Sequence, residues 1–177
     1  TESPMRQDLS PTGRLHLVLR DPRSQQVIES RCVPNLVTTA GRALLADLLT
    51  GSAQSIAQIQ MAVGSGLLDG ETEVQAPAYE DTALRNELTR VVTELSAPTV
   101  AALVPDGPPR SITAVTAVLE PQLGGESLVL REAGLVMTRL GSGEGSPETE
   151  ILYNRVVFPT ITKEPELQMT LTWEVIF

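Results

Sequence analysis

The sequence predicts a mainly β protein: an antiparallel β-sandwich of about seven or eight strands with an N-terminal β-hairpin and one α-helix. Short runs in which apolar and polar residues alternate recur along the chain, and turn residues separate them at intervals of about ten positions. Only one stretch has the apolar spacing of a helix, whereas a parallel α/β fold needs several helices. No repeat of fixed period suggests a solenoid or a propeller.

The length of 177 residues suits a single domain. We assign residues 14–177 to one sandwich domain and residues 1–13, which are polar and rich in turn formers, to a flexible N-terminal segment. A domain of this size buries a core without disulfides or metals, and the lone cysteine, Cys32, excludes an internal disulfide. The chain shows neither a signal peptide nor an apolar run of the roughly 18 residues that a membrane-spanning helix needs, so we expect a soluble protein made in a reducing cytoplasm.

The first two strands are predicted to form a hairpin at residues 14–33. Leucines alternate with other residues over 14–20, and the turn formers of 21–24 follow. A second extended run then covers residues 26–33.

A helix is predicted at about residues 38–50, where the period changes. Thr38 or Thr39 can cap its start, and Gly51 can close its end. The residues at helical spacing are Leu44, Leu45, Leu48 and Leu49.

After the helix, the chain returns to strand patterns separated by loops. An acidic loop with Gly and Pro covers residues 67–80, and residues 81–84 suggest a short helical turn capped by Asp81. The Gly- and Ser-rich segment 141–147 suggests a flexible hairpin loop. Extended runs are expected at 59–63, 88–95, 100–104, 112–119 and 128–137, and twice within 152–177.

The last of these runs alternates most clearly. From Leu167 onward every second residue is apolar, and the residues between them as far as Glu174 are Gln, Thr or Glu. We therefore expect this face, which includes Trp173, Val175 and Phe177, to lie in the core. Deletion of residues 175–177 is then expected to prevent soluble folding.

The charge of the chain argues against a nucleic-acid partner. The chain holds 13 basic and 22 acidic residues, a net charge of −9, and its residues 61–177 hold seven of the basic and seventeen of the acidic side chains. Phosphate binding needs clustered Lys and Arg, yet Lys163 is the only lysine and the arginines are scattered.

Few residues suit nucleophilic catalysis. His16, the only histidine, lies on a predicted strand, and Cys32 lies on the neighbouring strand of the hairpin, where the two form an incidental cross-strand pair. We interpret His16 as a surface residue. One His and one Cys cannot form a zinc site in one subunit, although a site shared between copies stays open. We expect no catalytic residue, no metal and no cofactor.

Carboxylates are the other candidates. Asp69, Glu71 and Glu73 form an acidic cluster, and carboxylates suffice for a calcium site or for a glycosidase pair. The cluster lacks the spacing and the central Gly of an EF-hand loop, so we interpret it as a solvated loop. Glu132 is expected to form a structural ion pair with an Arg.

The segment Gly64-Ser65-Gly66 follows a predicted strand, as a phosphate-binding loop does. It lacks the Gly-Lys-Ser/Thr that such loops carry, and no dinucleotide-binding fingerprint surrounds it. We interpret its glycines as turn residues.

Four segments follow one another in a distinctive order: NLVTTAGRALLADLLTG at 35–51, IQMAVGSG at 59–66, DTALRNELTR at 81–90, and LREAGLV at 130–136 followed by LYNRVVFPTITK at 152–163 and LTWEVIF at 171–177. In this order and spacing they resemble tail-fibre-type and tail-associated structural proteins of bacteriophages and of phage-tail-like contractile particles. The resemblance covers most of residues 35–177. It implies a non-enzymatic β-sandwich building block of a virion tail or of a tail-like particle.

The residues of LREAGL have structural explanations. Ala133 and Gly134 are small and permit a close backbone approach or a bulge. Arg131 and Glu132 point to opposite faces of the strand, so each is expected to pair with another element.

The residues of LYNRVVFP also have structural explanations. Tyr153 and Phe158 are expected to anchor the core, and Asn154 and Arg155 to tie loops. Pro159 is expected to stop the strand at its edge, because proline has no N–H to donate.

The resemblance implies other tail or baseplate proteins as partners, and a homo-oligomer that is either a trimer or a six-fold ring. Because the sequence ends at Phe177, an adaptor, collar, baseplate or short-fibre role is favoured over host recognition. The expected location is the virion tail after synthesis in the host cytoplasm, with neither nucleic acid nor membrane as a partner. Two alternatives stay open: a carbohydrate- or receptor-binding module, with Tyr79 as its loop aromatic, and a small acid-dependent hydrolase.

Overall fold

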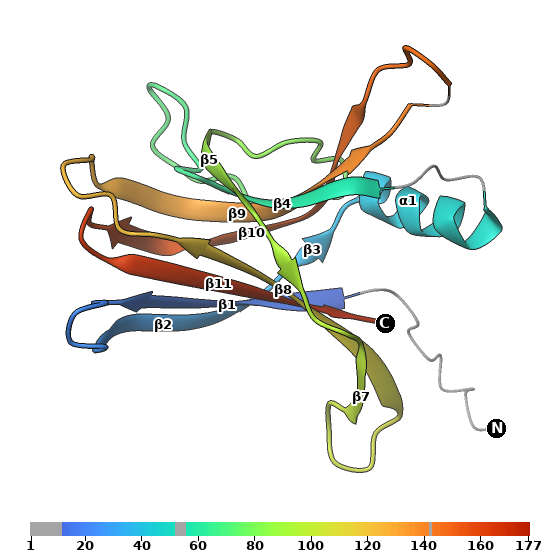
Figure 1. Ribbon diagram of the computed structural model, residues 1–177, viewed down its shortest axis with the longest axis horizontal. Helices are drawn as coiled ribbons and strands as arrows, with labels where there is room; N and C mark the ends of the chain where they lie inside the picture. The colour runs from blue at the N-terminus through green and yellow to red at the C-terminus, as the bar shows by residue number, and fades with distance from the viewer. Residues whose placement is uncertain (1–11, 52–55, 142) are drawn as a thin grey trace.

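The computed structural model describes residues 12–51, 56–141 and 143–177, and these form two antiparallel sheets with one helix at an end (Figure 1). The predicted mainly β, sandwich-like fold is confirmed. Residues 1–11, most of the segment expected to be flexible, lie outside the described residues. Thr12 and Gly13 belong to the first strand.

The first sheet contains the predicted hairpin. Its strand order is β2-β1-β11-β8-β6, and β7 pairs with a further part of β8. Strand β11 therefore lies between β1 and β8 and connects the hairpin to the rest of the sheet. The strands are β1 (Thr12–Arg20), β2 (Val27–Pro34), β6 (Glu94–Leu95), β7 (Thr99–Ala102), β8 (Pro109–Leu119) and β11 (Gln168–Ile176).

The second sheet has the strand order β3-β10-β9-β4-β5. Its central strands β9 and β10 form a long hairpin, and β4 pairs with β9 on the other side. The strands are β3 (Leu36–Val37), β4 (Ile56–Gly64), β5 (Glu87–Val92), β9 (Leu128–Arg139) and β10 (Thr149–Lys163).

The described residues contain eleven strands, more than the seven or eight expected. The difference arises from short strands, since β3 and β6 have two residues each and β7 has four. Two residues cannot display a period, so alternation in the sequence does not reveal such strands.

The helix α1 (Thr39–Thr50) begins and ends as predicted. The hydroxyl of Thr38 accepts a hydrogen bond from the backbone N–H of Gly41 at 3.0 Å, and Gly51 ends the helix with φ of +71°. A Cβ on Gly41 would overlap the carbonyl oxygen of Tyr153, so this glycine lets the helix approach β10. Within the described residues, no helix is long and apolar enough to cross a membrane.

The core lies between the two sheets, and alternation selects its residues. On β1 and β11 every second side chain points inward and is almost fully buried, as the sequence predicts. Side chains of the second sheet cover them from the opposite side. The buried residues with the largest side chains include Leu15, Leu17, Met61, Leu135, Tyr153, Ile161, Met169, Leu171 and Trp173.

The end of the last strand differs from the prediction. Val175 and Ile176 are both buried, so the period of two breaks there, and Phe177 is 45% exposed. Phe177 still pairs through its backbone, because its N–H donates to the carbonyl oxygen of Ser111 at 2.9 Å. The prediction that Phe177 lies in the core is therefore wrong.

The prediction that Pro159 ends its strand is wrong. Strand β10 continues to Lys163, and its pairing with β9 changes register between Val157 and Ile161. The irregularity leaves Pro159 without a ladder partner, which suits a residue that cannot donate a hydrogen bond.

A second irregularity in β10 lies opposite Val136 and Leu135 of β9, next to Gly134. The pairing shifts between Leu152 and Asn154, and Oδ1 of Asn154 accepts a hydrogen bond from the backbone N–H of Leu135 at 2.9 Å. A Cβ on Gly134 would lie 2.7 Å from the carbonyl oxygen of Asn154. Gly134 therefore permits the close backbone approach that the sequence suggested.

Candidate functional site

Glu132 on β9 is fully buried, with 0% exposure, at the centre of a polar network beneath the loop 65–86. Its Oε1 accepts hydrogen bonds from the backbone N–H groups of Asn86 at 2.8 Å and of Gly66 at 3.2 Å. Its Oε2 accepts from the backbone N–H of Arg85 at 3.0 Å and from Nε of Arg155 at 3.0 Å. One carboxylate therefore attaches both ends of this loop to the sheet.

The glycines after β4 make room for this carboxylate. Gly64 lies opposite Glu132 in the sheet, and a Cβ on Gly64 would lie 2.7 Å from Oε1 of Glu132. Gly66 has φ of +73°, a conformation that glycine adopts without strain. The segment Gly64-Ser65-Gly66 thus surrounds an anionic group, but that group is a side chain of the same chain.

Arg155 on β10 compensates the buried charge. Its Nη2 lies 2.9 Å from Oε2 of Glu132, and its Nη1 lies 3.0 Å from Oδ2 of Asp81. The expected ion pair of Glu132 with an arginine is therefore confirmed. Asp81 does not cap a helix, because residues 81–84 are not helical. It instead accepts a hydrogen bond from the backbone N–H of Ala78 at 2.9 Å and pairs with Arg155.

A second ion pair joins two residues of the same loop, Glu71 and Arg85. Nε of Arg85 donates to both carboxylate oxygens, at 3.0 and 3.1 Å, and Nη2 donates to Oε1. Hydrogen bonds from Arg85 and from the backbone N–H of Leu68 lower the pKa of Glu71 to about 2. Asp69 and Glu73 are exposed, and the described ranges hold no group of three His, Cys, Asp or Glu residues that could bind a metal.

We expect acid to weaken the ion pair between Glu71 and Arg85 in a defined pH range. The folded-state pKa of Glu71, about 2, lies below its ordinary value of 4.5. The ionised carboxylate therefore contributes stability that is present above pH 4.5 and is lost as the pH falls towards 2. Denaturant unfolding at several pH values should show a smaller pH dependence for Glu71→Gln than for the wild type. Asp69→Asn, a change at an exposed carboxylate of the same loop, is the control, and equal pH dependence of Glu71→Gln and wild type would contradict the expectation.

His16 and Cys32 lie opposite each other on β1 and β2, as predicted. Nε2 of His16 is 4.0 Å from Sγ of Cys32 and 3.5 Å from Oε2 of Glu174 on β11. Glu174 also pairs with Arg14. These side chains form a polar row on the outer face of the first sheet, and His16 is accessible to solvent, as interpreted from the sequence.

Tyr79, the loop aromatic of the glycan-binding alternative, is exposed but partly covered. The guanidinium carbon of Arg42, on α1, lies 5.7 Å from the centroid of its ring. A cation at this distance is attracted to the ring face. The sugar-stacking surface expected of a glycan site is therefore reduced on that face.

The hydrogen bonds to Glu132 hold the loop 65–86 against β9. A carboxylate offers about four lone-pair positions, and four donors occupy those of Glu132. No position on its oxygens is left for a substrate or for a metal. The network therefore serves to hold the loop 65–86 in place.

Sequence reasoning missed the backbone donors to Glu132 and, apart from this network, the burial of Lys163. Arg85 and Asn86 act on Glu132 through their backbone N–H groups, which no side-chain pattern reveals. Lys163 is only 3% exposed and lines a pocket between the sheets. A signal for Lys163 was present, since it follows the buried Ile161 by two positions on a strand.

Neither a scan of protein-family models nor searches of curated proteins and of solved structures found a match to this chain.

Proposed function

We propose that this chain is a non-enzymatic structural subunit of a phage tail or of a tail-like particle. It acts through self-association and through docking to other tail proteins. The order of its sequence segments supports the proposal. The observation that carries it is a projecting hairpin with exposed aliphatic side chains.

This hairpin, the β7–β8 arm, comprises residues 99–110 and extends beyond the sandwich (Figure 1). Every residue of β7 is exposed, and Val100 is 74% exposed. Leu103 and Val104 at the tip of the arm are exposed as well. An isolated two-stranded hairpin is marginally stable in water, so contact with another chain would stabilise the arm.

Open sheet edges support the same proposal. Strand β2 lies at one end of the first sheet, and β5 lies at one end of the second. Such edges carry backbone N–H and C=O groups that can pair with another chain. On β2 the edge also exposes Val27 and Ile28. Homo-oligomers commonly bury surfaces of this kind.

We expect light scattering after size exclusion to give the mass of a trimer or of a six-fold ring for the wild type. The double variant Val100→Asp/Val104→Asp should dissociate at a concentration at least about tenfold higher, because burial of each valine contributes about 1.5–3 kcal/mol. Leu123→Asp is the matched control, since Leu123 is 75% exposed but lies on the turn between β8 and β9.

Two results would contradict the proposal. A wild-type chain that stays monomeric at all concentrations, and does not co-purify with tail particles, would refute the structural role. An unchanged mass of the double variant across the same dilutions would refute the β7–β8 arm as the interface.

A further inference from the structure

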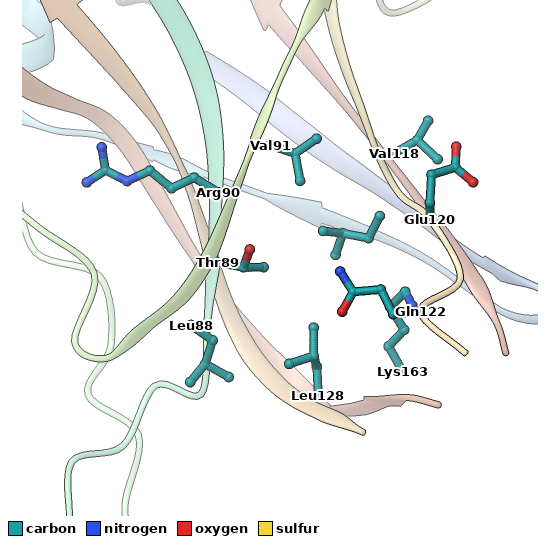
Figure 2. Close-up of a pocket in the computed structure, with 10 residues that line it drawn as sticks. Leu88, Thr89, Arg90, Val91, Val118, Glu120, Gln122, Leu128 and Lys163 are labelled. Atoms are coloured by element: carbon teal, nitrogen blue, oxygen red, sulfur yellow. The ribbon is translucent and has the colours of Figure 1, made fainter. Parts of the chain in front are cut away.

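A pocket of about 360 Å³ lies between the two sheets at the edge formed by β5 and β8 (Figure 2). The topology explains why the sheets do not close there. The chain passes from β5 in the second sheet to β6 in the first, and β6 pairs only with Val115 and Thr116 of β8. Among the described residues, the part of β8 that leads to Leu119 therefore has only β11 as a neighbouring strand.

Apolar and polar side chains line the pocket in similar measure. Val91 of β5, Leu119 of β8 and Leu128 of β9 supply aliphatic surface. Gln122, which also lines the pocket, lies on the turn after β8, and its backbone N–H donates to the carbonyl oxygen of Pro165 at 2.7 Å. This bond fixes the turn against the end of β10, where Lys163 lies.

Lys163 is the charged residue that this pocket buries most deeply. Its side chain follows that of Ile161 on the inward face of β10, and it forms no hydrogen bond or ion pair with the described residues. Burial lowers the pKa of Lys163, whereas the charges of Glu120 and Glu166 act to raise it. An ammonium group in apolar surroundings is costly unless an anion or a hydrogen-bond acceptor compensates it.

The other charged residues at the pocket have hydrogen-bond partners of their own, although the charge of Glu120 also acts on Lys163. Arg90 donates to Glu87 and Glu150, and Glu120 accepts from Gln168 at 3.0 Å. Figure 2 shows the Arg90 guanidinium and the Glu120 carboxylate directed away from the space beside Val91. Lys163 is therefore the charge that determines which ligand the pocket favours.

We propose that this pocket binds a small amphipathic carboxylate, with its anionic group on the ammonium of Lys163 and the amide of Gln122. Its hydrocarbon part packs against Val91, Leu119 and Leu128. The pocket volume falls within the range of about 300–1,000 Å³ that small-molecule sites occupy, and such sites combine apolar walls with a few polar groups. A carboxylate pairs with the ammonium, and an apolar body replaces water on the aliphatic walls. This inference does not depend on the proposed structural role.

The composition of the chain gives a site-specific test. Because Lys163 is the only lysine, labelling with [13C]lysine places one side-chain Cε signal in the NMR spectrum of the intact protein. Titration with octanoate should shift this signal saturably. The neutral analogue 1-octanol should bind at least about tenfold more weakly, as expected for loss of a hydrogen bond between charged groups. No saturable shift, or equal affinity for the two probes, would overturn the proposal.

Two variants distinguish direct contact between Lys163 and the ligand from a long-range effect of the protein's positive charge. Lys163→Met should weaken octanoate binding, measured by calorimetry, by about tenfold or more, while leaving 1-octanol binding unchanged. Arg23→Met removes the same charge from an exposed turn and should leave both affinities unchanged. Equal octanoate affinities of the wild type and Lys163→Met would overturn the proposal, and so would equal weakening by both variants. The wild-type titration tests the proposal even if Lys163→Met does not fold.

Discussion

Replacement of Glu132 by Gln is expected to lower the free energy of unfolding by about 3–5 kcal/mol, the range for removal of one partner from a buried ion pair. Gln keeps the volume but loses the charge, and its NH₂ group replaces one acceptor oxygen. Arg155 then remains buried with only Asp81 as its anion, and one or two backbone N–H groups of the loop 65–86 lose their acceptor. Denaturant unfolding of the purified variant measures the loss.

Glu150→Gln is the matched control for this prediction. Glu150 is exposed and accepts two hydrogen bonds from Arg90, so it also forms a carboxylate–guanidinium pair. Surface pairs of this kind contribute about 0–1 kcal/mol. Similar losses for Glu132→Gln and Glu150→Gln would show that burial of the network does not determine its contribution. Hydrogen exchange should also rise in the loop 65–86 of Glu132→Gln and remain unchanged there in Glu150→Gln.

Trp173→Ala is expected to cost about 3–5 kcal/mol of the free energy of unfolding. The indole has 0% exposure and lies on β11, between β1 and β8 in the first sheet. Its removal leaves a cavity where residues of both sheets meet, because the close-packed neighbours relax only in part. Thermal and denaturant unfolding, monitored by circular dichroism, measure the change.

Phe177→Ala provides the comparison within the same sequence pattern. The alternation of residues places Phe177 on the same face as Trp173, so the sequence alone predicts a large loss for both. Because the Phe177 side chain is 45% exposed, we expect a loss of about 1 kcal/mol or less. A loss for Phe177→Ala as large as that for Trp173→Ala would contradict the observed burial.

The parts of the fold that the sequence predicted correctly are those with local signals. The hairpin of β1 and β2 follows from alternating leucines and a turn, and α1 follows from its period, its Thr38 cap and Gly51. These signals act over a few residues, where backbone geometry and capping decide the structure. These signals can therefore be recognised in the sequence without knowledge of the tertiary contacts.

The parts that were missed depend on contacts between distant segments. Asp81 looked like a helix cap, but an ion pair with Arg155 on β10 fixes it instead. Pro159 looked like a strand end, yet a register shift allows β10 to continue past it. The candidate site was predicted in part. The sequence indicated that Glu132 pairs with an arginine, and the structure identifies that arginine as Arg155.

The central place of β11 in the first sheet has a consequence during synthesis. Its residues 168–176 separate β1 from β8, and β1 is among the first described residues to leave the ribosome. The β1 edge of the hairpin must therefore stay unpaired until residues 168–176 have emerged. A nascent chain with such long-range pairing folds slowly and exposes strands that can aggregate. We expect incomplete chains released before β11 to require chaperones.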